Sequence, residues 1–306
     1  MRCLVLGGGG FIGSAVSDRL LHYGHRVRIL ARPKLVPYRL FGTQEAVEWM
    51  RGDFLNIHDL RQAVDGIDVV FHMVSATVPK SANDDPILDV QSNLVGSLQL
   101  LQVLQERPVS KVIFVSSGGT VYGRARTVPI GEDHPTNPLT AYGITKLAIE
   151  KHLHVFTHLT GIPSLILRVS NPYGPRQRAE TAQGAAVVFL HRILAGLPIQ
   201  IWGDGQTTRD YIYVSDVAEP FAQAVNYGGS EPVFNVGTGE GTSLNTLAEM
   251  VEQVTKLPVV RTYLPSRRFD VPISILDNTR IRKALGWSPQ TTLREGIMRT
   301  LAWMKG

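Results

Sequence analysis

The sequence has one cysteine, no long apolar run and no dense cluster of charge. Its single cysteine, Cys3, excludes an internal disulfide, and because it lies in an apolar run we expect it to be buried and inert. No apolar run approaches the roughly 18 residues that cross a bilayer, so we expect no membrane span. Met1 is followed within a few residues by a glycine-rich turn, which leaves no room for a signal peptide. These absences together predict a cytoplasmic protein.

The charge of the chain is basic but dispersed. The 306 residues carry a formal charge of +5, and the sequence pI is about 9.4. Lys and Arg are scattered, without a basic arm, so we expect an anionic small-molecule substrate and no nucleic acid. The nine histidines show no ligand spacing with cysteine or carboxylate partners, and we therefore expect no metal.

Short apolar runs alternate with amphipathic segments over the first half of the chain. We expect buried strands at 4–6, 27–30, 69–71, 112–115 and 165–167. Helices are expected between and after them, near 11–23, 57–65, 89–106 and 141–159. This alternation predicts an α/β fold, a doubly wound parallel sheet of the Rossmann type with helices on both faces.

The first of these strands leads into a glycine-rich turn. The turn contains Gly7, Gly10 and Gly13, with Phe11 and Ile12 before the last of them, and a helix is expected to follow. Glycines at these places allow a tight turn and a close approach of the backbone to a pyrophosphate, and the helix N-terminus then faces the phosphate charge. The turn therefore predicts a bound dinucleotide.

The end of the second strand bears on which dinucleotide is bound. An acidic residue there normally binds the adenosine ribose, but this chain has Ala31-Arg32. Arg32 can pair with a 2′-phosphate, which favours NADP, or it can simply end an exposed strand. Asp53 and Phe54 follow a third strand. Asp53 can accept a hydrogen bond from the adenine amino group or cap the next helix, although Asn56 is better placed for the cap.

After about residue 170 the alternation loosens and prolines become more frequent. We interpret 1–170 as the dinucleotide-binding domain, with a later return to the sheet near 210–238 that includes a strand at 233–235. Residues 171–306 are then mainly a smaller, interleaved C-terminal lobe that binds the substrate.

A tyrosine and a lysine share one face of the expected helix at 141–159. Tyr142 and Lys146 are four residues apart, and a serine-rich strand end at 115–120 precedes them. The ordinary pKa of tyrosine is about 10, so we expect the nearby ammonium and a positive nicotinamide ring to favour the phenolate. The phenolate can then accept a proton from a sugar hydroxyl while a hydride passes to the cofactor.

Motifs that match those of one enzyme family run through nearly the whole chain, at 7–13, 52–53, 71–72, 116–123, 142–146, 168–175, 203–212 and 267–270. With them the chain resembles the extended short-chain dehydrogenase/reductase family, and within it the UDP-glucose 4-epimerase-like branch. The last three motifs separate nucleotide-sugar enzymes from other members of the family.

The resemblance implies a role for each matching residue. Tyr142 would be the catalytic base, and Lys146 would be its electrostatic partner and would hold the nicotinamide ribose. Asn93 would contact the cofactor near that ribose. Residues of the second lobe would hold the substrate diphosphate, namely Asn171, Arg209 and Arg267. The helices near 89–106 and 141–159 would pair with those of a second copy, which implies a homodimer.

One catalytic position departs from the family pattern. The family's catalytic Ser or Thr stands four residues before the tyrosine of Tyr122-Gly123, and here that position is Gly118. Either Ser117 or Thr120 would have to supply the hydroxyl. We favour Ser117 for the catalytic hydrogen bond and Thr120 for the sugar.

The function that the resemblance favours is 4-epimerisation of a UDP-hexose or a UDP-N-acetylhexosamine through a transient 4-keto sugar and bound NAD. Ser274 stands where some relatives carry a bulky residue beside the sugar C2, so its small side chain leaves room for an N-acetyl group. The main alternative is an NAD(P)H-dependent reductase of a nucleotide 4-keto-6-deoxy sugar, which Ala31-Arg32 supports.

Two other functions are less favoured. A 4,6-dehydratase would need an acidic pair where Gly118-Gly119 stands. A cofactor-binding regulatory protein without catalysis is the candidate from a different class, and the presence of both Tyr142 and Lys146 argues against it.

Overall fold

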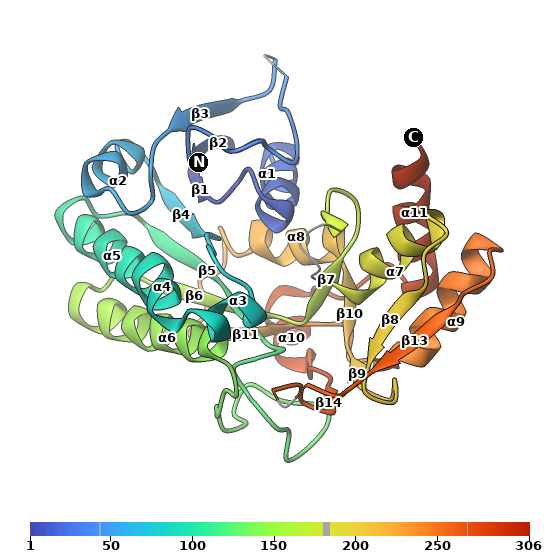
Figure 1. Ribbon diagram of the computed structural model, residues 1–306. Helices are drawn as coiled ribbons and strands as arrows, with labels where there is room; N and C mark the ends of the chain where they lie inside the picture. Colours follow the sequence, from blue (N-terminus) through green and yellow to red (C-terminus); the bar gives the residue numbers. More distant parts are fainter. Residues whose placement is uncertain (43, 180–183, 268) are drawn as a thin grey trace.

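The computed structural model describes residues 1–42, 44–179, 184–267 and 269–306. At its centre is a seven-stranded sheet in the order β11-β6-β5-β4-β1-β2-β3, and every neighbouring pair is parallel (Figure 1). The strands are β1 (Arg2–Leu6), β2 (Arg26–Ala31), β3 (Val47–Arg51), β4 (Val69–His72), β5 (Lys111–Ser117), β6 (Ser164–Val169) and β11 (Val233–Val236). Each expected strand lies within one of these, and the predicted fold class is confirmed.

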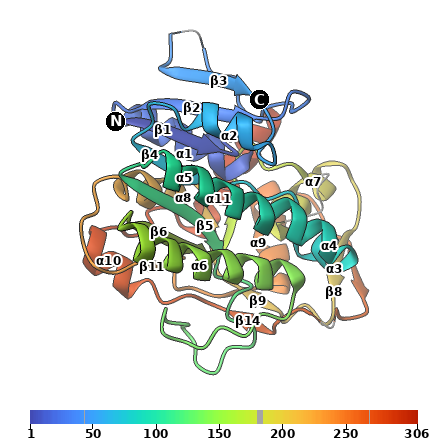
Figure 2. The same ribbon diagram turned by 90° about the vertical axis from the view of Figure 1, so that its left-hand side faces the viewer.

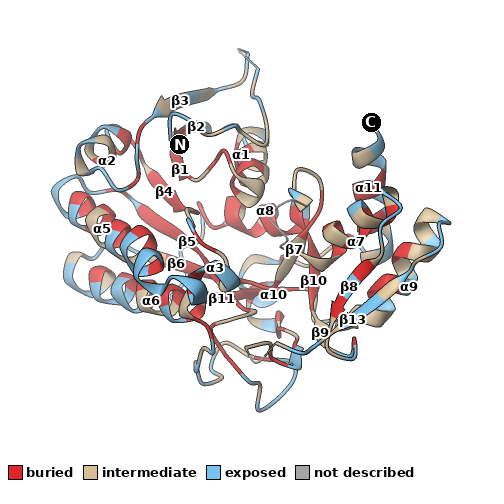
Figure 3. Cartoon of the chain, in the orientation of Figure 1, coloured by how far each residue is buried: buried red, intermediate tan, exposed pale blue. Residues whose placement is uncertain are grey.

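Helices cover both faces of the sheet, because successive side chains of a strand point to opposite faces. On one face, an apolar cluster joins the strands to α1 (Phe11–His22) and α8 (Val214–Gln223). On the other, a second cluster joins them to α2 (Ile57–Ala63), α5 (Gly96–Glu106) and α6 (Ala141–Thr160). In Figure 3 the strands between these layers are largely buried, whereas the outer faces of α5 and α6 are exposed.

Side-chain caps fix where two of the helices begin. The Asn56 side chain accepts a hydrogen bond from the backbone of the first turn of α2, which confirms Asn56 as the cap in place of Asp53. The Thr140 hydroxyl accepts the Gly143 amide hydrogen at 3.0 Å, so that α6 begins at Ala141. This start places the Tyr-x-x-x-Lys motif in the first two turns of α6.

The helix expected at 89–106 is interrupted. It consists of α4 (Pro86–Asp89), the π-helical turn η1 (Val90–Val95) and α5. The Ser92 hydroxyl donates to the Leu88 carbonyl at 2.5 Å, and the Ser97 hydroxyl donates to the Asn93 carbonyl at 2.6 Å. Side-chain hydrogen bonds of this kind compete with the regular helix ladder, and single π-turns occur often at functional sites.

A separate apolar cluster forms the core of the second lobe. It is built by α7 (Ala185–Leu194), α9 (Leu244–Thr255), α11 (Leu293–Lys305) and β8 (Ile199–Trp202), which pairs with β13 (Arg261–Leu264). Two smaller sheets lie near it, β10 (Tyr211–Tyr213) with β7 (Asn171–Tyr173), and β12 (Thr242–Ser243) with β9 (Thr208–Arg209) and β14 (Ile273–Ser274).

The second lobe is interleaved with the sheet. The chain enters it through β7, directly after β6, and returns to the sheet with α8 and β11 (Figure 1). The helix α10 (Thr279–Leu285) then packs beside β11. The segments that lead into the lobe therefore start at the carboxyl end of the sheet. Within the described ranges, no helix is both long and apolar enough to span a membrane.

Candidate active site

The predicted site residues lie after the carboxyl ends of neighbouring strands. Gly7 follows β1, Arg32 follows β2, Ser117 ends β5, and Asn171 begins the segment after β6. Ser75, which the sequence analysis did not single out, lies just beyond β4. Ligands of doubly wound sheets bind at this edge. The strand order thus brings together residues that are far apart in the sequence.

The glycine-rich turn leaves no space for side chains. Gly7 has a φ of +85°, and a Cβ added at Gly13 would lie 2.2 Å from the Gly7 carbonyl oxygen. The turn is closed by a hydrogen bond of 3.0 Å from the Gly10 amide to the same carbonyl. Helix α1 begins at the next residue, and no side chain caps its N-terminus. This cradle of bare backbone fits a dinucleotide diphosphate.

The residues at the expected adenosine end differ in their surroundings. Ala31 is buried and Arg32 is exposed. Asp53 is exposed, and its carboxylate accepts the Leu55 amide hydrogen at 3.0 Å. Phe54 packs in the core beside β4 and is nearly buried, so that its side chain is largely structural.

Tyr142 and Lys146 lie together at the start of α6. The Lys146 ammonium lies 5.7 Å from the centre of the Tyr142 ring and 4.8 Å from that of Phe114. It donates a hydrogen bond of 3.1 Å to the Val115 carbonyl of β5. The side chain of Lys146 is buried, so the pair lies in a sheltered environment where charges interact strongly.

The protein alone does not favour the Tyr142 phenolate, contrary to the expectation from sequence. Burial raises the pKa of Tyr142 to about 12, a hydrogen bond with Ser75 lowers it, and the nearby Asp89 raises it. Burial also lowers the pKa of Lys146 to about 8, against the opposing effects of Asp89 and Glu150. Burial is thus the main influence on the Tyr142 pKa, and a positive nicotinamide ring, when bound, would favour the phenolate.

The hydroxyl groups at the serine-rich strand end differ in their surroundings. Ser116 donates to the buried carboxylate of Glu150 on α6 and is therefore structural. Gly118 has no room for a side chain, because an added Cβ would lie 2.4 Å from Leu276. Thr120 packs against Gly143, next to Tyr142, and its hydroxyl is buried without a partner in the described part of the chain.

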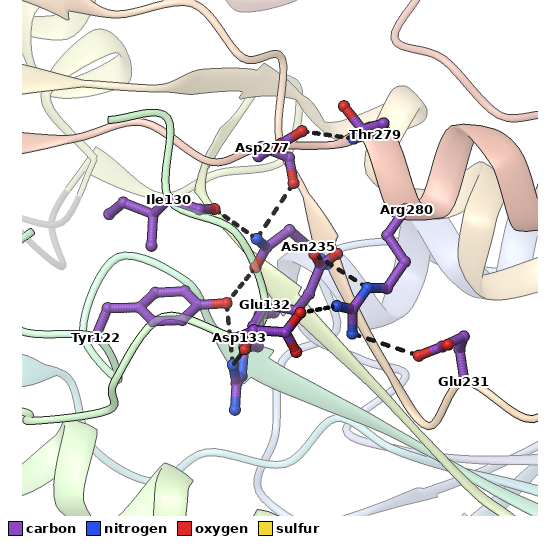
Figure 4. Close-up of polar contacts among 10 residues, drawn as sticks. Tyr122, Ile130, Glu132, Asp133, Glu231, Asn235, Asp277, Thr279 and Arg280 are labelled. Atoms are coloured by element: carbon purple, nitrogen blue, oxygen red, sulfur yellow. Dashed lines mark hydrogen bonds and ion pairs between the residues drawn. The ribbon is translucent and has the colours of Figure 1, made fainter. Parts of the chain in front are cut away.

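A polar cluster fixes the loop between β5 and α6 to the far edge of the sheet (Figure 4). Tyr122 donates to the Asn235 side chain of β11 at 2.7 Å, and Asn235 donates to the Ile130 carbonyl at 2.8 Å. The Glu132 carboxylate accepts the Asn235 amide hydrogen at 2.9 Å and faces Arg280 of α10 at 3.5 Å. This cluster holds the loop, and with it the segment that carries Thr120, against the 276–280 region.

The second lobe adds polar groups to the same edge. Asn171 of β7 pairs in register with Tyr211 of β10. The side-chain nitrogen of Asn171 and the hydroxyl of Tyr211 are buried and have no hydrogen-bond partner among the described residues. A Cβ added at Gly119 would lie 3.9 Å from that nitrogen, so the two lobes meet here. Unpaired buried polar groups are costly, and a polar ligand would satisfy them.

The two predicted diphosphate arginines lie on separate strands and loops of the second lobe. Arg209 of β9 pairs in register with Ser274 of β14 and donates to the Val271 carbonyl at 2.7 Å. Ser274 is itself buried. The Arg267 guanidinium stacks 3.9 Å from the centre of the Trp202 ring. The structure thus brings Ser274 to Arg209, and it gives no direct contact between Arg267 and Arg209.

The Asn93 side chain is engaged inside the protein. Its amide donates to Thr77 and to Asp89, at 2.9 Å each, and its oxygen accepts the Ala76 amide hydrogen at 2.8 Å. Its predicted contact with the cofactor stays a prediction. Asp89 itself was missed, although it stands four residues before Asn93, a spacing that puts both on one helix face. Tyr211 was also missed, although it lies in a recognised motif.

Comparisons with known proteins agree over the whole chain. It is 36% identical to a UDP-glucose 4-epimerase of Mycolicibacterium smegmatis, with 100% of this chain and 99% of the relative covered. It is 32% identical to a dTDP-4-dehydro-6-deoxyglucose reductase of Escherichia coli, with 96% and 94% covered. The structure of a UDP-glucose 4-epimerase with UDP-glucose from Thermotoga maritima is similar, with a TM-score of 0.94, 33% identity, and 100% and 99% covered.

The family comparison fits the geometry of the turn, the Tyr-Lys pair and the sheet. The model of the NAD dependent epimerase/dehydratase family matches residues 3–237, which is most of the chain and includes all of these features. The chain therefore belongs to the NAD dependent epimerase/dehydratase family.

Proposed function

We propose that the protein catalyses the 4-epimerisation of a UDP-hexose or a UDP-N-acetylhexosamine. The observation that carries this proposal is the Tyr142–Lys146 pair at the start of α6, together with the unpaired polar groups of Thr120, Asn171 and Tyr211 in the described structure. The similarity to UDP-glucose 4-epimerases over the full length of the chain supports the same activity.

NAD would be held by Gly7, Gly10 and Gly13 with the N-terminus of α1, and when bound it supplies an acceptor and donor of hydride for the sugar C4. Tyr142 accepts the proton of the 4-hydroxyl as C4 becomes a ketone, and it returns a proton to the oxygen after the sugar has turned over. Lys146 holds a positive charge beside the developing phenolate.

The second lobe would retain the nucleotide while the sugar turns. Guanidinium groups suit phosphate oxygens, and Arg209 and Arg267 are the candidates for the diphosphate, with Asn171 beside it. A buried arginine that lacks a close carboxylate favours an anionic partner. Arg209 comes near to this description, because its side chain is only 16% exposed, burial lowers its pKa, and its ion pair with Asp270 is long, at 4.0 Å. Ser274 would border the sugar.

The missing hydroxyl at Gly118 is best supplied by Thr120. Its hydroxyl is buried, unpaired in the described structure and next to the turn of α6 that carries Tyr142. The sequence favours Ser117 for this role, and Ser117 stays the alternative. We therefore propose that Thr120 makes the hydrogen bond to the reacting oxygen.

The homodimer and the cytoplasmic location also stay proposals. Six apolar side chains of α4, η1 and α6 have exposed fractions between 42% and 70%, namely Ile87, Leu88, Val95, Ile144, Val155 and Leu159. In Figure 2 these helices lie side by side on one face of the molecule. A second copy would bury this face. Cys3 is buried, and burial raises the pKa of its thiol to about 12, as suits an unreactive thiol in a reducing compartment.

The test is to incubate the purified protein with UDP-glucose and, separately, with UDP-N-acetylglucosamine, without added cofactor. We expect NMR spectroscopy to show the 4-epimer of at least one sugar, and mass spectrometry of the denatured protein to release NAD. Tyr142→Phe should reduce turnover by at least about 10³-fold, because it removes the acid–base group. Tyr23→Phe is the matched control, since Tyr23 is exposed at the end of α1.

The reductase is the second candidate, favoured by the absence of an acid at Ala31 and by the exposed Arg32. It would appear as a protein that leaves both UDP-sugars unchanged, releases no NAD and oxidises NADPH with a nucleotide 4-keto sugar. That result would replace the epimerase.

A further inference from the structure

Asp89 is a buried carboxylate at the junction of α4 and η1. Its side chain is fully buried, and its partners are neutral donors. It accepts hydrogen bonds from the Thr77 hydroxyl, from the Asn93 amide at 2.9 Å and from the Thr145 hydroxyl at 2.5 Å. A buried carboxylate is retained only when such donors satisfy it, so this arrangement is specific.

The three donors come from three segments that surround the Tyr142–Lys146 pair. Thr145 belongs to α6 and directly precedes Lys146. Thr77 lies two residues beyond Ser75, which hydrogen-bonds Tyr142 and also donates to the Thr77 carbonyl at 3.0 Å. The third donor is Asn93, which lies in the π-turn. Asp89 therefore ties α6, the loop after β4 and the π-turn to one point.

The charged groups that face the pair come from several elements. Asp89 of α4 is one. Glu150 of α6 is another, and it is paired with Arg168 of β6 at 2.6 Å. His72 of β4 is neutral at physiological pH, because burial and Lys146 lower its pKa to about 3. Asp89 is thus a carboxylate near the pair whose hydrogen-bond partners among the described residues are all neutral donors.

We propose that Asp89 is a positioning residue for the reaction, which fixes Thr145 and the loop after β4 and places a negative charge near the buried side chain of Lys146. Only the expected effect of Asp89 on kcat rests on the proposed function. The positioning of Lys146 itself can be measured without any substrate.

The sign of the effect follows from the electrostatics. Asp89 raises the pKa of both Lys146 and Tyr142, so its removal lowers both. The kcat profile depends on both groups, because Tyr142 must lose a proton and Lys146 must keep one. Both limbs should therefore move to lower pH, by about half a unit to one unit. A purely structural role for Asp89 would reduce kcat without moving the limbs together.

The first measurement is the NMR titration of lysine labelled with ¹³C at Cε. In the wild type, one resonance should titrate near pH 8 and should be absent from Lys146→Arg. Asp89→Asn keeps the size of the side chain and removes its charge, and we expect it to lower the pKa of Lys146. Asp85→Asn is the matched control, because Asp85 caps α4 from an exposed position and Asn is an equally good cap.

An unchanged or raised pKa of Lys146 in Asp89→Asn would overturn the inference, whatever the enzyme does with UDP-sugars. A lowered pKa in a protein that turns over no UDP-sugar would support the inference and reject the proposed function. Thr145→Val is a second variant, which keeps the charge and removes one hydrogen bond. We expect kcat to fall about tenfold, while KM and the two limbs of the pH profile stay unchanged. A kcat equal to that of the wild type would also contradict the proposed role of Asp89.

Discussion

At residue 118 the chain has neither a side chain nor space for one. The Leu276 side chain fills the volume that a Cβ would need, 2.4 Å away. A serine placed there would overpack the site, so the usual position of the catalytic hydroxyl is closed in this protein. Thr120, two residues on, lies against the turn of α6 that follows Tyr142. We propose that Thr120 supplies the hydroxyl in place of residue 118.

The consequence for catalysis can be tested with two hydroxyl deletions. Thr120→Val is nearly isosteric and removes only the hydroxyl, and we expect kcat to fall about 10²-fold with little change in KM. Ser117→Ala, the matched control, should change kcat by less than about threefold. Steady-state kinetics on the substrate identified above measure both. The opposite order of the two effects would restore the assignment that the sequence favoured.

Contacts between distant residues mark where prediction from sequence ends. The glycine turn and the Tyr142–Lys146 spacing are local, so the sequence predicted them and the structure places them at one edge of the sheet. The contact of Leu276 with Gly118 joins residues that are far apart in the chain, and no local pattern indicates it. The burial that raises the pKa of Tyr142 is likewise a property of the packed molecule.

At the scale of elements, regular strands and helices were predictable and their interruption was not. Apolar periodicity is local, and each expected strand lies within an observed one. The segment at 89–106 has helical periodicity throughout. Its π-turn lies where Asp89 and Asn93 also hydrogen-bond residues of other segments, Thr145 and Thr77. Periodicity does not report such partners.

Helix α6 and strand β6 are joined by a buried ion pair. The guanidinium of Arg168 and the carboxylate of Glu150 are 2.6 Å apart, with exposed fractions of 6% and 4%. Arg168 also donates to the Tyr122 hydroxyl at 3.0 Å. Glu150 lies one helical turn beyond Lys146. The pair therefore fixes the helix that carries the catalytic groups against the sheet.

Removing one partner of this pair should be costly. Glu150→Ala would leave the Arg168 charge buried and unpaired, and we expect the free energy of unfolding to fall by about 3–5 kcal/mol. Glu295→Ala is the control, because it breaks an exposed pair with Arg299 on α11 and should cost less than about 1 kcal/mol. Chemical denaturation of the two variants measures both values. Equal losses of unfolding free energy in the two variants would show that the buried Arg168–Glu150 pair contributes no more than the exposed pair.

At the scale of the whole molecule, the exposed apolar side chains of α4, η1 and α6 lie on the face shown in Figure 2. Large exposed apolar patches mark interaction sites. The helices of this face also carry Tyr142, Lys146 and Asp89. A second copy bound there would therefore also help to hold these residues in place.

We expect the wild-type protein to be a dimer by light scattering coupled to size-exclusion chromatography. Val155→Glu combined with Leu159→Glu should give a monomer, because two charges would be buried on each side of the interface. Leu197→Glu is the control, since Leu197 has an exposed fraction of 50%, equal to that of Val155, but lies after α7 in the other lobe. A monomeric wild type would reject the proposed interface.

The division of the chain into two domains after residue 170 also stays a prediction. The strand order shows that the first domain also needs residues from beyond that point. The edge strand β11 is made of residues 233–236 but pairs with β6, and α8 packs on α1. During synthesis on the ribosome, the cofactor-binding lobe therefore cannot be completed until β11 has been made, which ends at Val236, about half way through residues 171–306. Until then β6 is an open edge, the kind of edge at which chains aggregate. The two lobes must mature as one folding unit, and a fragment that stops at residue 170 would lack both its last strand and the cover of its first helix.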